Sequence, residues 1–472
     1  MISRRTMYGR MCLTLRRIRR MRFWKLLLVG LIILMLYLVK LHRELSSKQS
    51  GRKHSVNPVI KEEPYTYLPD PETTFLFENT PPSSEECVKT VLIYGNLTDM
   101  KDWPELSNFY KYFSKSKLKA HEVFYKCPTF DCVIKVSLGT SYSLFQGKDA
   151  IIFGMLPKVF EGRLDDLIER KPEDGQTWIF YSTETPLRIV NWNRDVRIGD
   201  LKYHKIMSYR LDSDIHIPFA YYEPYNKTEQ LLHVNESQAN FVVNKTKDVI
   251  WIGSNCKQIF WPRIPMMQRL QRLIALDDFG KCGRFHCLPK RSARCADIFR
   301  KYHFYLAFAN SECYEYITEK FWWNALGHDV IPVVYGAPKS DFEMLAPPNS
   351  YIHISDFYRA KELVNFLTDI KDSSDKYKQY FKWKERGRIV HTFPNKMNSL
   401  CNILPHLGSF ELKRLGNSSW FNGCRRLADE TAYNPYEPKQ QRWDYILWSP
   451  WNPNSGKTIG EEKRDRMEIG KF

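Results

Sequence analysis

The sequence has no internal repeat, no low-complexity block and no basic stripe interleaved with aromatic residues. The first two absences exclude a repeat protein and a compositionally biased scaffold. Acidic residues are also missing from residues 1–43, which hold eleven Lys and Arg. These account for 11 of the formal net charge of +18 and leave +7 for the other 429 residues. The basic balance therefore belongs to the N-terminus, and we expect no nucleic-acid partner.

What the sequence does contain indicates a folded protein. The chain has 472 residues, of which 43% are hydrophobic and 14% aromatic. This composition is typical of a globular protein, and the length allows one large core or two medium ones.

Residues 23–41, FWKLLLVGLIILMLYLVKL, follow the basic head and form a candidate membrane segment. Their uninterrupted apolar part is short for a span and also fits the core of a signal peptide. Lys25 and Lys40 can extend their amines to the membrane surface, and the residues that follow offer no small-x-small cleavage site. With the arginines held in the cytoplasm, we predict a cytoplasmic tail over 1–22, a signal anchor over 23–41 and type II topology.

Cysteine usage and glycosylation signals agree with that topology. Ten of the eleven cysteines lie beyond the anchor, an even number that suits disulfides in an oxidising lumen. Candidate N-glycosylation sites begin at Asn96, Asn226, Asn235, Asn244 and Asn417, all on the predicted lumenal side. We therefore expect the endoplasmic reticulum or Golgi membrane, with the folded part of the chain in the lumen.

Short apolar runs recur through the rest of the chain, each ending in small or polar residues. They cover residues 90–96, 150–154, 177–184, 248–255, 304–311 and 329–336. Their length and helix-sized spacing predict parallel strands covered on both faces, hence an α/β fold. The predicted divisions are a polar stem over 42–86, lobes over 87–245 and 246–431, and a polar tail over 432–472, whose aromatic patch WDYILWSPW has no assigned role.

The segment YLAFANSECYEYITEKFWWNALGHDVIPVVYGAP, from Tyr305, places Glu319 and Lys320 between two of these runs. A helix starting near Tyr316 would form an apolar stripe from Ile317, Phe321, Trp322, Ala325 and Leu326. Its opposite face would carry Tyr316, Glu319, Lys320 and Trp323. Ligands bind at the carboxyl ends of strands in an open parallel sheet, and a lysine there suits a diphosphate. The alternative is a solvated surface ion pair.

The same segment closely resembles the signature of the α1,3-fucosyltransferases, glycosyltransferase family ten, and SYIHISDF at 350–357 matches as well. The similarity covers most of residues 90–425. It is closest to the animal branch described as protein O-fucosyltransferases of EMI domains. The resemblance implies a GT-B fold of two Rossmann-like lobes, GDP-fucose as the donor, inversion at the anomeric carbon and no metal or other cofactor.

The resemblance also implies site residues. In the second lobe, the positions that match donor-binding residues are Arg263, Asn310, Tyr316, Glu319 and Lys320. In the first lobe, Glu184 in YSTETP matches the general base, which would take the acceptor proton. Arg263 and Lys320 can stabilise a departing diphosphate, and Glu319 can accept hydrogen bonds from sugar hydroxyls. The family's usual Glu before Asn310 is Ala309 here, which is the one feature that supports an inactive homologue.

Two further motifs have metal-binding interpretations. Asp212-Ser213-Asp214 has the D-x-D pattern that other glycosyltransferases use for a divalent ion, but similar text occurs in this metal-independent family. CGRFHCLPKRSARC offers zinc ligands at Cys282, His286, Cys287 and Cys295. In an oxidising lumen we expect disulfides instead, with the pairing left open.

The sequence therefore predicts a GDP-fucose-dependent inverting fucosyltransferase of the secretory pathway. The closest branch implies Ser or Thr hydroxyls of a folded, disulfide-containing EMI-type domain as acceptor. The wider family implies α1,3 transfer to N-acetylglucosamine of N-glycans or lactosamine. A third interpretation is a lectin or chaperone that keeps the fold without turnover.

Overall fold

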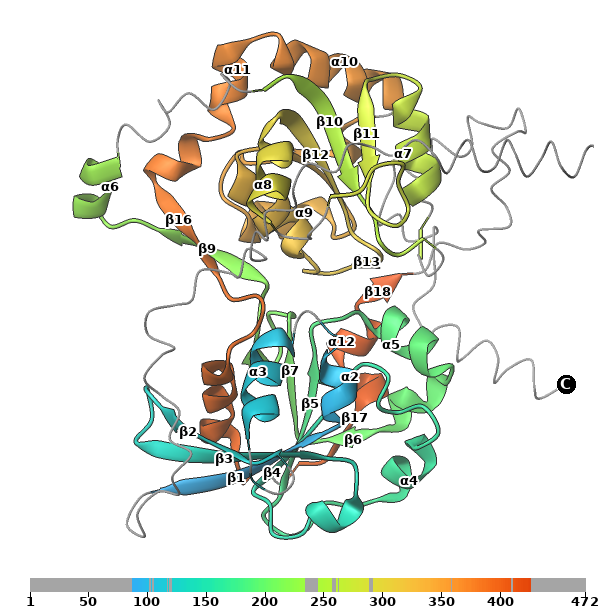
Figure 1. Cartoon of the computed structure of the whole chain (residues 1–472), viewed down its shortest axis with the longest axis vertical. Helices are drawn as coiled ribbons and strands as arrows, with labels where there is room; N and C mark the ends of the chain where they lie inside the picture. The colour runs from blue at the N-terminus through green and yellow to red at the C-terminus, as the bar shows by residue number, and fades with distance from the viewer. Residues whose placement is uncertain are drawn as a thin grey trace, which may run out of the picture. The chain divides into compact units, whose positions relative to one another are not determined.

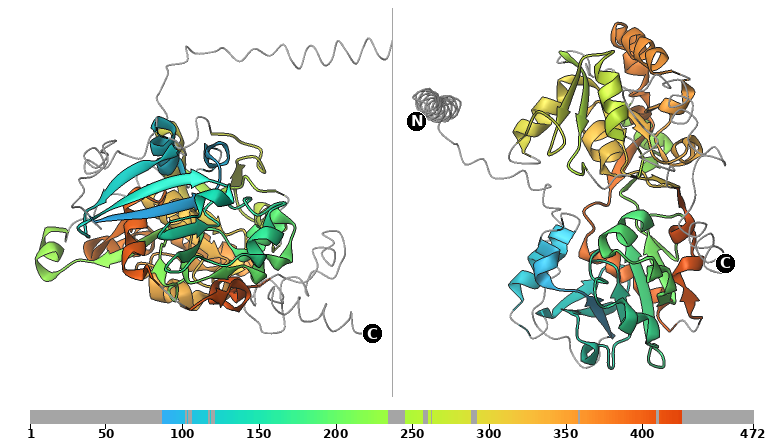
Figure 2. Two further views of the ribbon diagram at one scale, coloured as in Figure 1. Left: turned by 90° about the horizontal axis from the view of Figure 1, so that it is seen from below. Right: turned by 90° about the vertical axis from the view of Figure 1, so that its right-hand side faces the viewer.

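The computed structural model describes residues 87–101, 103, 106–116, 118, 121–233, 245–256, 260–261, 263–287, 292–357, 359–408 and 411–425. The predicted cytoplasmic tail, anchor, stem and C-terminal tail all lie outside these residues. Within the described ranges, no helix has the length and apolar character needed to cross a membrane. The described chain builds two α/β lobes, each around its own sheet (Figures 1 and 2).

The first lobe contains a seven-stranded sheet in the order β2-β3-β1-β4-β5-β7-β8. Only β2 runs antiparallel to its neighbour. The strands are β1 Val88–Tyr94, β2 Val123–Cys127, β3 Cys132–Gly139, β4 Ala150–Phe153, β5 Thr177–Ser182, β7 Lys205–Ser208 and β8 Ile215–His216. The helical segments are α2 Leu97–Lys101, α3 Ser107–Lys115, η4 Tyr142–Leu144, α4 Leu164–Glu169, α5 Pro186–Asn193 and η5 Val196–Asp200. Every residue of β4 and β5 is buried, as expected for parallel strands covered on both faces.

The second lobe contains a five-stranded, wholly parallel sheet in the order β11-β10-β12-β14-β15. The strands are β10 Lys247–Ile252, β11 Leu276–Phe279, β12 Tyr302–Phe308, β14 Ile331–Tyr335 and β15 Ile352–His353. The helical segments are α7 Arg263–Gln271, α8 Ala293–Arg300, η7 Lys320–Ala325, η8 Leu326–His328, α9 Lys339–Leu345, η9 Ile354–Asp356, α10 Ala360–Lys371, α11 Ser374–Gln379 and η10 Lys382–Glu385. Apolar residues of α7 and α10 form one core cluster with β10, β12 and β14. The six apolar runs in the sequence thus correspond to β1, β4, β5, β10, β12 and β14, and the α/β prediction is confirmed.

The chain crosses between the lobes twice at one place. Strand β9, Ala220–Pro224, leaves the first lobe and pairs antiparallel with β16, Gly387–His391, which leaves the second (Figure 1). Helix α6, Lys227–His233, follows β9.

After β16 the chain returns to the first lobe. This last part contains η11 Met397–His406, β17 Lys413–Arg414, η12 Leu415–Asn417 and α12 Ser419–Asn422. The strand that follows, β18 Cys424–Arg425, pairs antiparallel with β13, Glu312–Cys313, of the second lobe. Strand β17 pairs with β6, Lys202–Tyr203, and a disulfide joins Cys401 to Cys127 of β2. From the sequence we predicted that all of residues 246–431 belong to the second lobe, so the return to the first lobe was not predicted. The reason is that its contacts to the first lobe are made to residues about 200 or more positions away, which local patterns do not record.

All ten cysteines in the described part of the chain form disulfides. The pairs are Cys87–Cys132, Cys127–Cys401, Cys256–Cys282, Cys287–Cys295 and Cys313–Cys424. This confirms the disulfide interpretation of CGRFHCLPKRSARC, because its three cysteines are all oxidised and unavailable as zinc ligands.

The helix expected to start near Tyr316 begins later. Residues 316–318 are non-helical, and a π-helical turn starts at Lys320. Glu315 has a left-handed backbone with φ of 61°, which is strained for a non-glycine residue and interrupts a regular helix. The predicted apolar stripe is nevertheless buried, with all five side chains at most 4% exposed.

Candidate functional site

A cavity of about 790 Å³ lies at the carboxyl ends of strands in the second sheet and is closed on one side by the first lobe. Gly253, Ser254 and Asn255 follow β10 in its wall, and Asn310 follows β12. The first lobe contributes Glu184 and Arg188. The carboxyl edge of an open parallel sheet is where such folds bind ligands.

Glu184 is held rigidly at the end of β5. Its carbonyl accepts hydrogen bonds from Ser182 Oγ at 2.9 Å and from Trp420 Nε1 at 3.1 Å. The next residue, Thr185, caps α5 by accepting from the backbone N–H of Arg188, and Pro186 occupies the first turn. The local sequence TETP therefore ends the strand, starts the helix and fixes the carboxylate between them.

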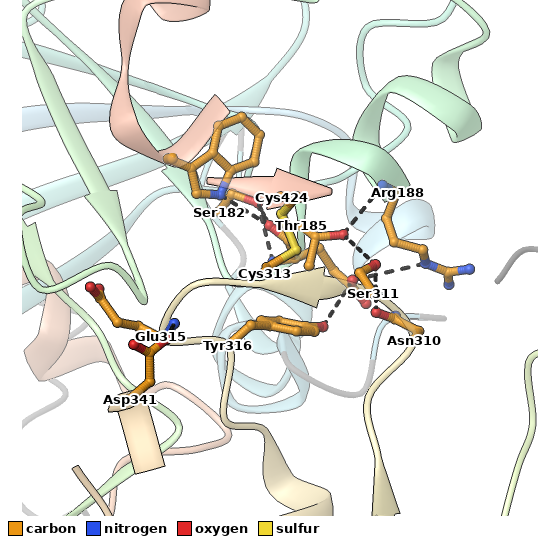
Figure 3. The surroundings of a disulfide bond; sticks show 12 residues. Ser182, Thr185, Arg188, Asn310, Ser311, Cys313, Glu315, Tyr316, Asp341 and Cys424 are labelled. Atoms are coloured by element: carbon orange, nitrogen blue, oxygen red, sulfur yellow. Dashed lines mark hydrogen bonds and ion pairs between the residues drawn. A yellow bond between two sulfur atoms is a disulfide. The ribbon is translucent and has the colours of Figure 1, made fainter. Parts of the chain in front are cut away.

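Glu184 is 8% exposed, and its carboxylate contacts both lobes. Its Oε2 accepts a hydrogen bond from the Tyr316 hydroxyl at 3.2 Å and lies 3.9 Å from Arg188 Nε. Nearby, the hydroxyls of Thr185 and Ser311 lie 3.0 Å apart and join the lobes a second time, as Figure 3 shows. Tyr316 is not part of the cavity wall, so its contribution to the site is made through Glu184.

Arg263 is the most deeply buried cation of the cavity wall, with 2% of its surface exposed. Its guanidinium donates to the carbonyls of Asn255 at 2.8 Å and Phe308 at 3.4 Å. The Nε–H has no hydrogen-bond partner, and Arg263 forms no ion pair with another described residue. Burial, followed by the positive charge of Arg188, lowers the pKa of Arg263 to about 10, so the group stays charged at neutral pH. A buried cation without an acidic partner suits an anionic ligand.

Glu319 and Lys320 form an ion pair of 2.8 Å at the cavity wall, with side chains 29% and 20% exposed. The two interpretations of this pair are therefore not exclusive, since it is an ion pair and also faces the cavity. Lys320 opens the π-helical turn η7, and Trp323 and Asn324 of the same turn line the cavity. Turns of this kind occur often at functional sites.

Asn310 completes the set, with its Oδ1 accepting from Ser311 Oγ at 3.0 Å. Five of the six residues singled out in the sequence thus line one cavity, although they come from three separate parts of the chain: Glu184, Arg263, Asn310, Glu319 and Lys320.

Ala309, the departure from the family pattern, does not line the cavity. Its backbone N–H donates to Tyr335 O, and a Cβ placed on Gly336 would lie 2.5 Å from its own Cβ. The alanine therefore packs tightly against Gly336, behind the wall rather than in it.

The D-x-D motif has structural contacts. Asp214 accepts from Lys205 Nζ at 3.1 Å and from the backbone N–H of Ile206 at 2.9 Å, and Asp212 is 3.4 Å from Arg210. These contacts brace the connection between β7 and β8. Within the described ranges, no cluster of three or more His, Cys, Asp or Glu could hold a metal ion.

Some residues of the cavity wall were not singled out from the sequence. Arg188 is the most informative, because its guanidinium lies over the Trp192 ring at 4.0 Å as well as near Glu184. Its spacing of four residues from Glu184 was the signal that could have revealed it. Other polar wall residues include Asn255, Lys281, Arg300, Asn324, His328 and His391, and no spacing in the sequence links them. His286, which the sequence offered only as a zinc ligand, lies in the wall as well.

Two family profiles match the chain. Residues 88–220 match the fucosyltransferase N-terminal profile, and residues 242–417 match the C-terminal profile of glycosyltransferase family 10 (fucosyltransferase). The chain is 30% identical to glycoprotein 3-alpha-L-fucosyltransferase A of Drosophila melanogaster, over 76% of this chain and 65% of that one, just under two thirds of the fly protein. It is 32% identical to alpha-(1,3)-fucosyltransferase 7 of Bos taurus, over 58% of this chain and 75% of the relative. A solved structure of an alpha1,3-fucosyltransferase aligns with 70% of the chain at 14% identity and a TM-score of 0.37.

Proposed function

Because the chain belongs to glycosyltransferase family 10, the fucosyltransferases, we propose that it transfers fucose from GDP-fucose to an acceptor hydroxyl within this cavity. The observation that carries the proposal is the convergence of a general base candidate, Glu184, and a buried unpaired cation, Arg263, on one cavity. They come from different lobes, so the cavity offers an acceptor side and a donor side.

The proposed chemistry is a single displacement. The acceptor oxygen bonds to the anomeric carbon of fucose while the bond from that carbon to the β-phosphate oxygen breaks. Glu184 takes the acceptor proton, and GDP leaves with the bonding electrons. Arg263 and Lys320 stabilise the negative charge that grows on the diphosphate. Glu319 and Asn310 bind sugar hydroxyls, and Tyr316 orients Glu184. Attack opposite the leaving group inverts the anomeric carbon.

This chemistry assigns no role to a metal ion, because Arg263 and Lys320 can carry the diphosphate charge. GDP-fucose is a substrate, and we propose no cofactor.

The matched relatives are named as α1,3-fucosyltransferases, and the names of two of them specify a 4-galactosyl-N-acetylglucosaminide, which supports a glycan acceptor bearing N-acetylglucosamine. We propose this acceptor class first. The Ser and Thr hydroxyls of a folded EMI-type domain, expected from the sequence resemblance, stay a prediction that the same experiment tests.

We further propose that the enzyme works in the lumen of the endoplasmic reticulum or Golgi, held by an anchor over residues 23–41. The five disulfides suit an oxidising compartment. Of the candidate glycosylation sites, Asn226 and Asn417 are exposed and Asn96 is partly exposed. Asn235 and Asn244 lie outside the described residues.

The test uses the full-length protein with GDP-fucose in EDTA, offered either a lactosamine glycan or a folded EMI-type domain. Incorporation is followed by intact mass. Glu184→Gln should abolish transfer to the accepted substrate without weakening GDP binding, whereas Glu169→Gln, at the exposed end of α4, should change neither.

Mass gained only by the glycan supports the first acceptor class, and mass gained by the protein domain replaces it with the second. Transfer that requires manganese contradicts the metal-independent mechanism. GDP-fucose binding with no transfer to either acceptor supports the lectin or chaperone interpretation instead.

A further inference from the structure

Arg188 is a second buried cation of the cavity wall, and the chemistry described so far gives it no role. Only 9% of the residue is exposed, and it lines the same cavity as Arg263 and Lys320. Those two cations come from the second lobe, whereas Arg188 belongs to α5 of the first lobe. Both lobes therefore contribute buried positive charge to this cavity.

The guanidinium of Arg188 is held in place by aromatic side chains of the first lobe. The ring of Trp192, one turn further along α5, lies 4.0 Å from it, and Trp103 packs edge-on against that ring at 5.0 Å. In Figure 3 the guanidinium lies on the same side of the Cys313–Cys424 disulfide as Asn310, which also lines the cavity. A planar cation fixed in this way needs little reordering to bind a ligand.

Two opposite electrostatic interactions act on Arg188. Its Nε lies 3.9 Å from Glu184 Oε2, which is an ion pair too long for a hydrogen bond. Its charge also acts on Arg263 of the other lobe, and after burial it is the largest cause of the lowered pKa of that guanidinium. Two like charges in a wall shielded from water repel each other unless an anion lies between them. An anion bound at Arg263 therefore also interacts with Arg188.

We propose that Arg188 is a further diphosphate-binding residue, contributed by the first lobe, and that it exchanges Glu184 for the diphosphate as fucose is transferred. This inference rests on the proposed function. Before transfer, Glu184 is ionised and pairs with Arg188. Glu184 becomes neutral when it takes the acceptor proton, and the electron pair of the broken bond adds a negative charge to GDP.

The anionic partner of Arg188 thus changes during the reaction. Its interaction with Glu184 weakens as the proton arrives, and its interaction with the diphosphate strengthens as the leaving group gains charge. An interaction that is stronger in the transition state than in the bound substrate increases the rate of the chemical step. Arg188 would then couple proton uptake in the first lobe to departure of GDP from the second.

The alternative is that Arg188 only orients Glu184. The two roles differ in their effect on nucleotide binding. A residue that serves only the base has no contact with the nucleotide, so its loss leaves GDP affinity unchanged. A residue that binds the diphosphate distinguishes GDP from GMP, because GMP lacks the β-phosphate.

The test measures binding of GDP and GMP to the full-length protein by calorimetry. Arg188→Gln should weaken GDP binding about tenfold to a hundredfold, as expected for a lost hydrogen bond between charged groups, and leave GMP affinity unchanged. Glu184→Gln copies the protonated base and releases Arg188. It should strengthen GDP binding in the wild-type background and have no effect when Arg188→Gln is also present, a coupling that the double-mutant cycle measures.

Arg194→Gln is the matched control, since Arg194 ends the same helix and is exposed outside the cavity. It removes the same charge and should bind GDP as wild type does. Arg188→Lys keeps the charge and should recover part of the GDP affinity that Arg188→Gln loses. Retained GMP affinity in both Arg188 variants shows that the nucleotide site remains folded.

The proposal is overturned if Arg188→Gln binds GDP as tightly as wild type or weakens GMP binding as much as GDP binding. It is also overturned if Glu184→Gln changes GDP affinity equally with and without Arg188. In these cases fucose transfer by the wild-type protein leaves the proposed function standing. Failure of the wild-type protein to bind GDP would overturn both.

Discussion

The hydroxyl of Tyr316 donates a hydrogen bond of 3.2 Å to the carboxylate of Glu184, across 132 positions of sequence and from one lobe to the other. The tyrosine ring packs against Tyr209 and Phe219, with ring centres 4.9 Å and 6.0 Å away. Its partners are therefore first-lobe residues, although the backbone of Tyr316 belongs to the second lobe. The orientation of the proposed base thus depends on how the lobes meet.

Tyr316→Phe removes this hydrogen bond and keeps the ring contacts. A hydrogen bond to a charged group contributes about 1.5–3 kcal/mol, so we expect kcat to fall about tenfold to a hundredfold while GDP affinity is unchanged. Steady-state transfer assays and GDP calorimetry measure the two quantities. Tyr221→Phe, on the exposed face of β9, is the control and should behave as wild type. An unchanged kcat in Tyr316→Phe would show that Glu184 needs no help from the opposite lobe.

Arg263→Lys tests the donor side. Lysine keeps the charge but loses the planar fork that can bond two phosphate oxygens, so we expect GDP affinity to fall about tenfold to a hundredfold. Calorimetry with GDP measures the change, and thermal unfolding without ligand checks that the fold survives. Arg272→Lys, which is exposed just after α7, should have no effect. Wild-type affinity in Arg263→Lys would remove Arg263 from the diphosphate site.

Much of the fold could be predicted because its strands are continuous apolar runs. Runs such as TWIFYS and FYLAF are buried on both faces, so neither alternation nor long-range information was needed to find them. The return of residues 397–422 to the first lobe could not be predicted in this way. The pairing of Lys413 with Tyr203 and the bond between Cys401 and Cys127 join distant segments whose local sequences carry no mark of one another.

The residues of the candidate site likewise include some that could be predicted from the sequence and some that could not. Glu184, Asn310 and the Glu319–Lys320 pair follow strands or open a helical turn, positions that the sequence reveals. The helix start was misplaced because Glu315 adopts a left-handed backbone and residues 316–318 are non-helical, and helical periodicity does not record backbone conformation. His391 reaches the cavity only through tertiary folding, and His286, which the sequence offered only as a zinc ligand, does so too.

The disulfides should differ in what they contribute to stability. The chain-entropy model predicts about 5 kcal/mol for the 111-residue separation of Cys313–Cys424 and about 2.5 kcal/mol for the 8-residue separation of Cys287–Cys295. Replacing each pair by alanine should therefore lower the free energy of unfolding more for Cys313–Cys424. Chemical denaturation of the two double variants measures the difference. Equal losses would mean that strain or residual structure, rather than loop closure, dominates.

The raised pKa of the Asp341 carboxyl should make the stability of the fold depend on pH. Burial raises the pKa of this carboxyl to about 6, with the Glu315 charge adding to the effect and a hydrogen bond from the Glu315 N–H opposing it. Between about pH 4 and pH 6 the folded protein holds a proton that the unfolded chain has released. Stability therefore falls as pH rises through this window and changes no further above it.

Asp341→Asn removes that titration and keeps an oxygen that can accept from Glu315. Relative to wild type, the free energy of unfolding of the variant should rise from about pH 4 to pH 6 and then level off. Urea denaturation at pH 4, 5, 6 and 7 measures it. Asp369→Asn, at an exposed ion pair with Lys376, should show no such trend. A constant difference across the series would contradict the raised pKa.

The discontinuous first lobe has a consequence for biosynthesis. Its sheet is synthesised early. The disulfide from Cys127 can form only after Cys401, 274 positions later, has been translated, and β6 can pair only after β17 has been translated. The entire second lobe is translated in that interval. The first lobe therefore cannot mature as an autonomous module, and neither lobe can be cut out and grafted at a single junction. A premature stop codon shortly after β16 would leave the second sheet whole and damage the first.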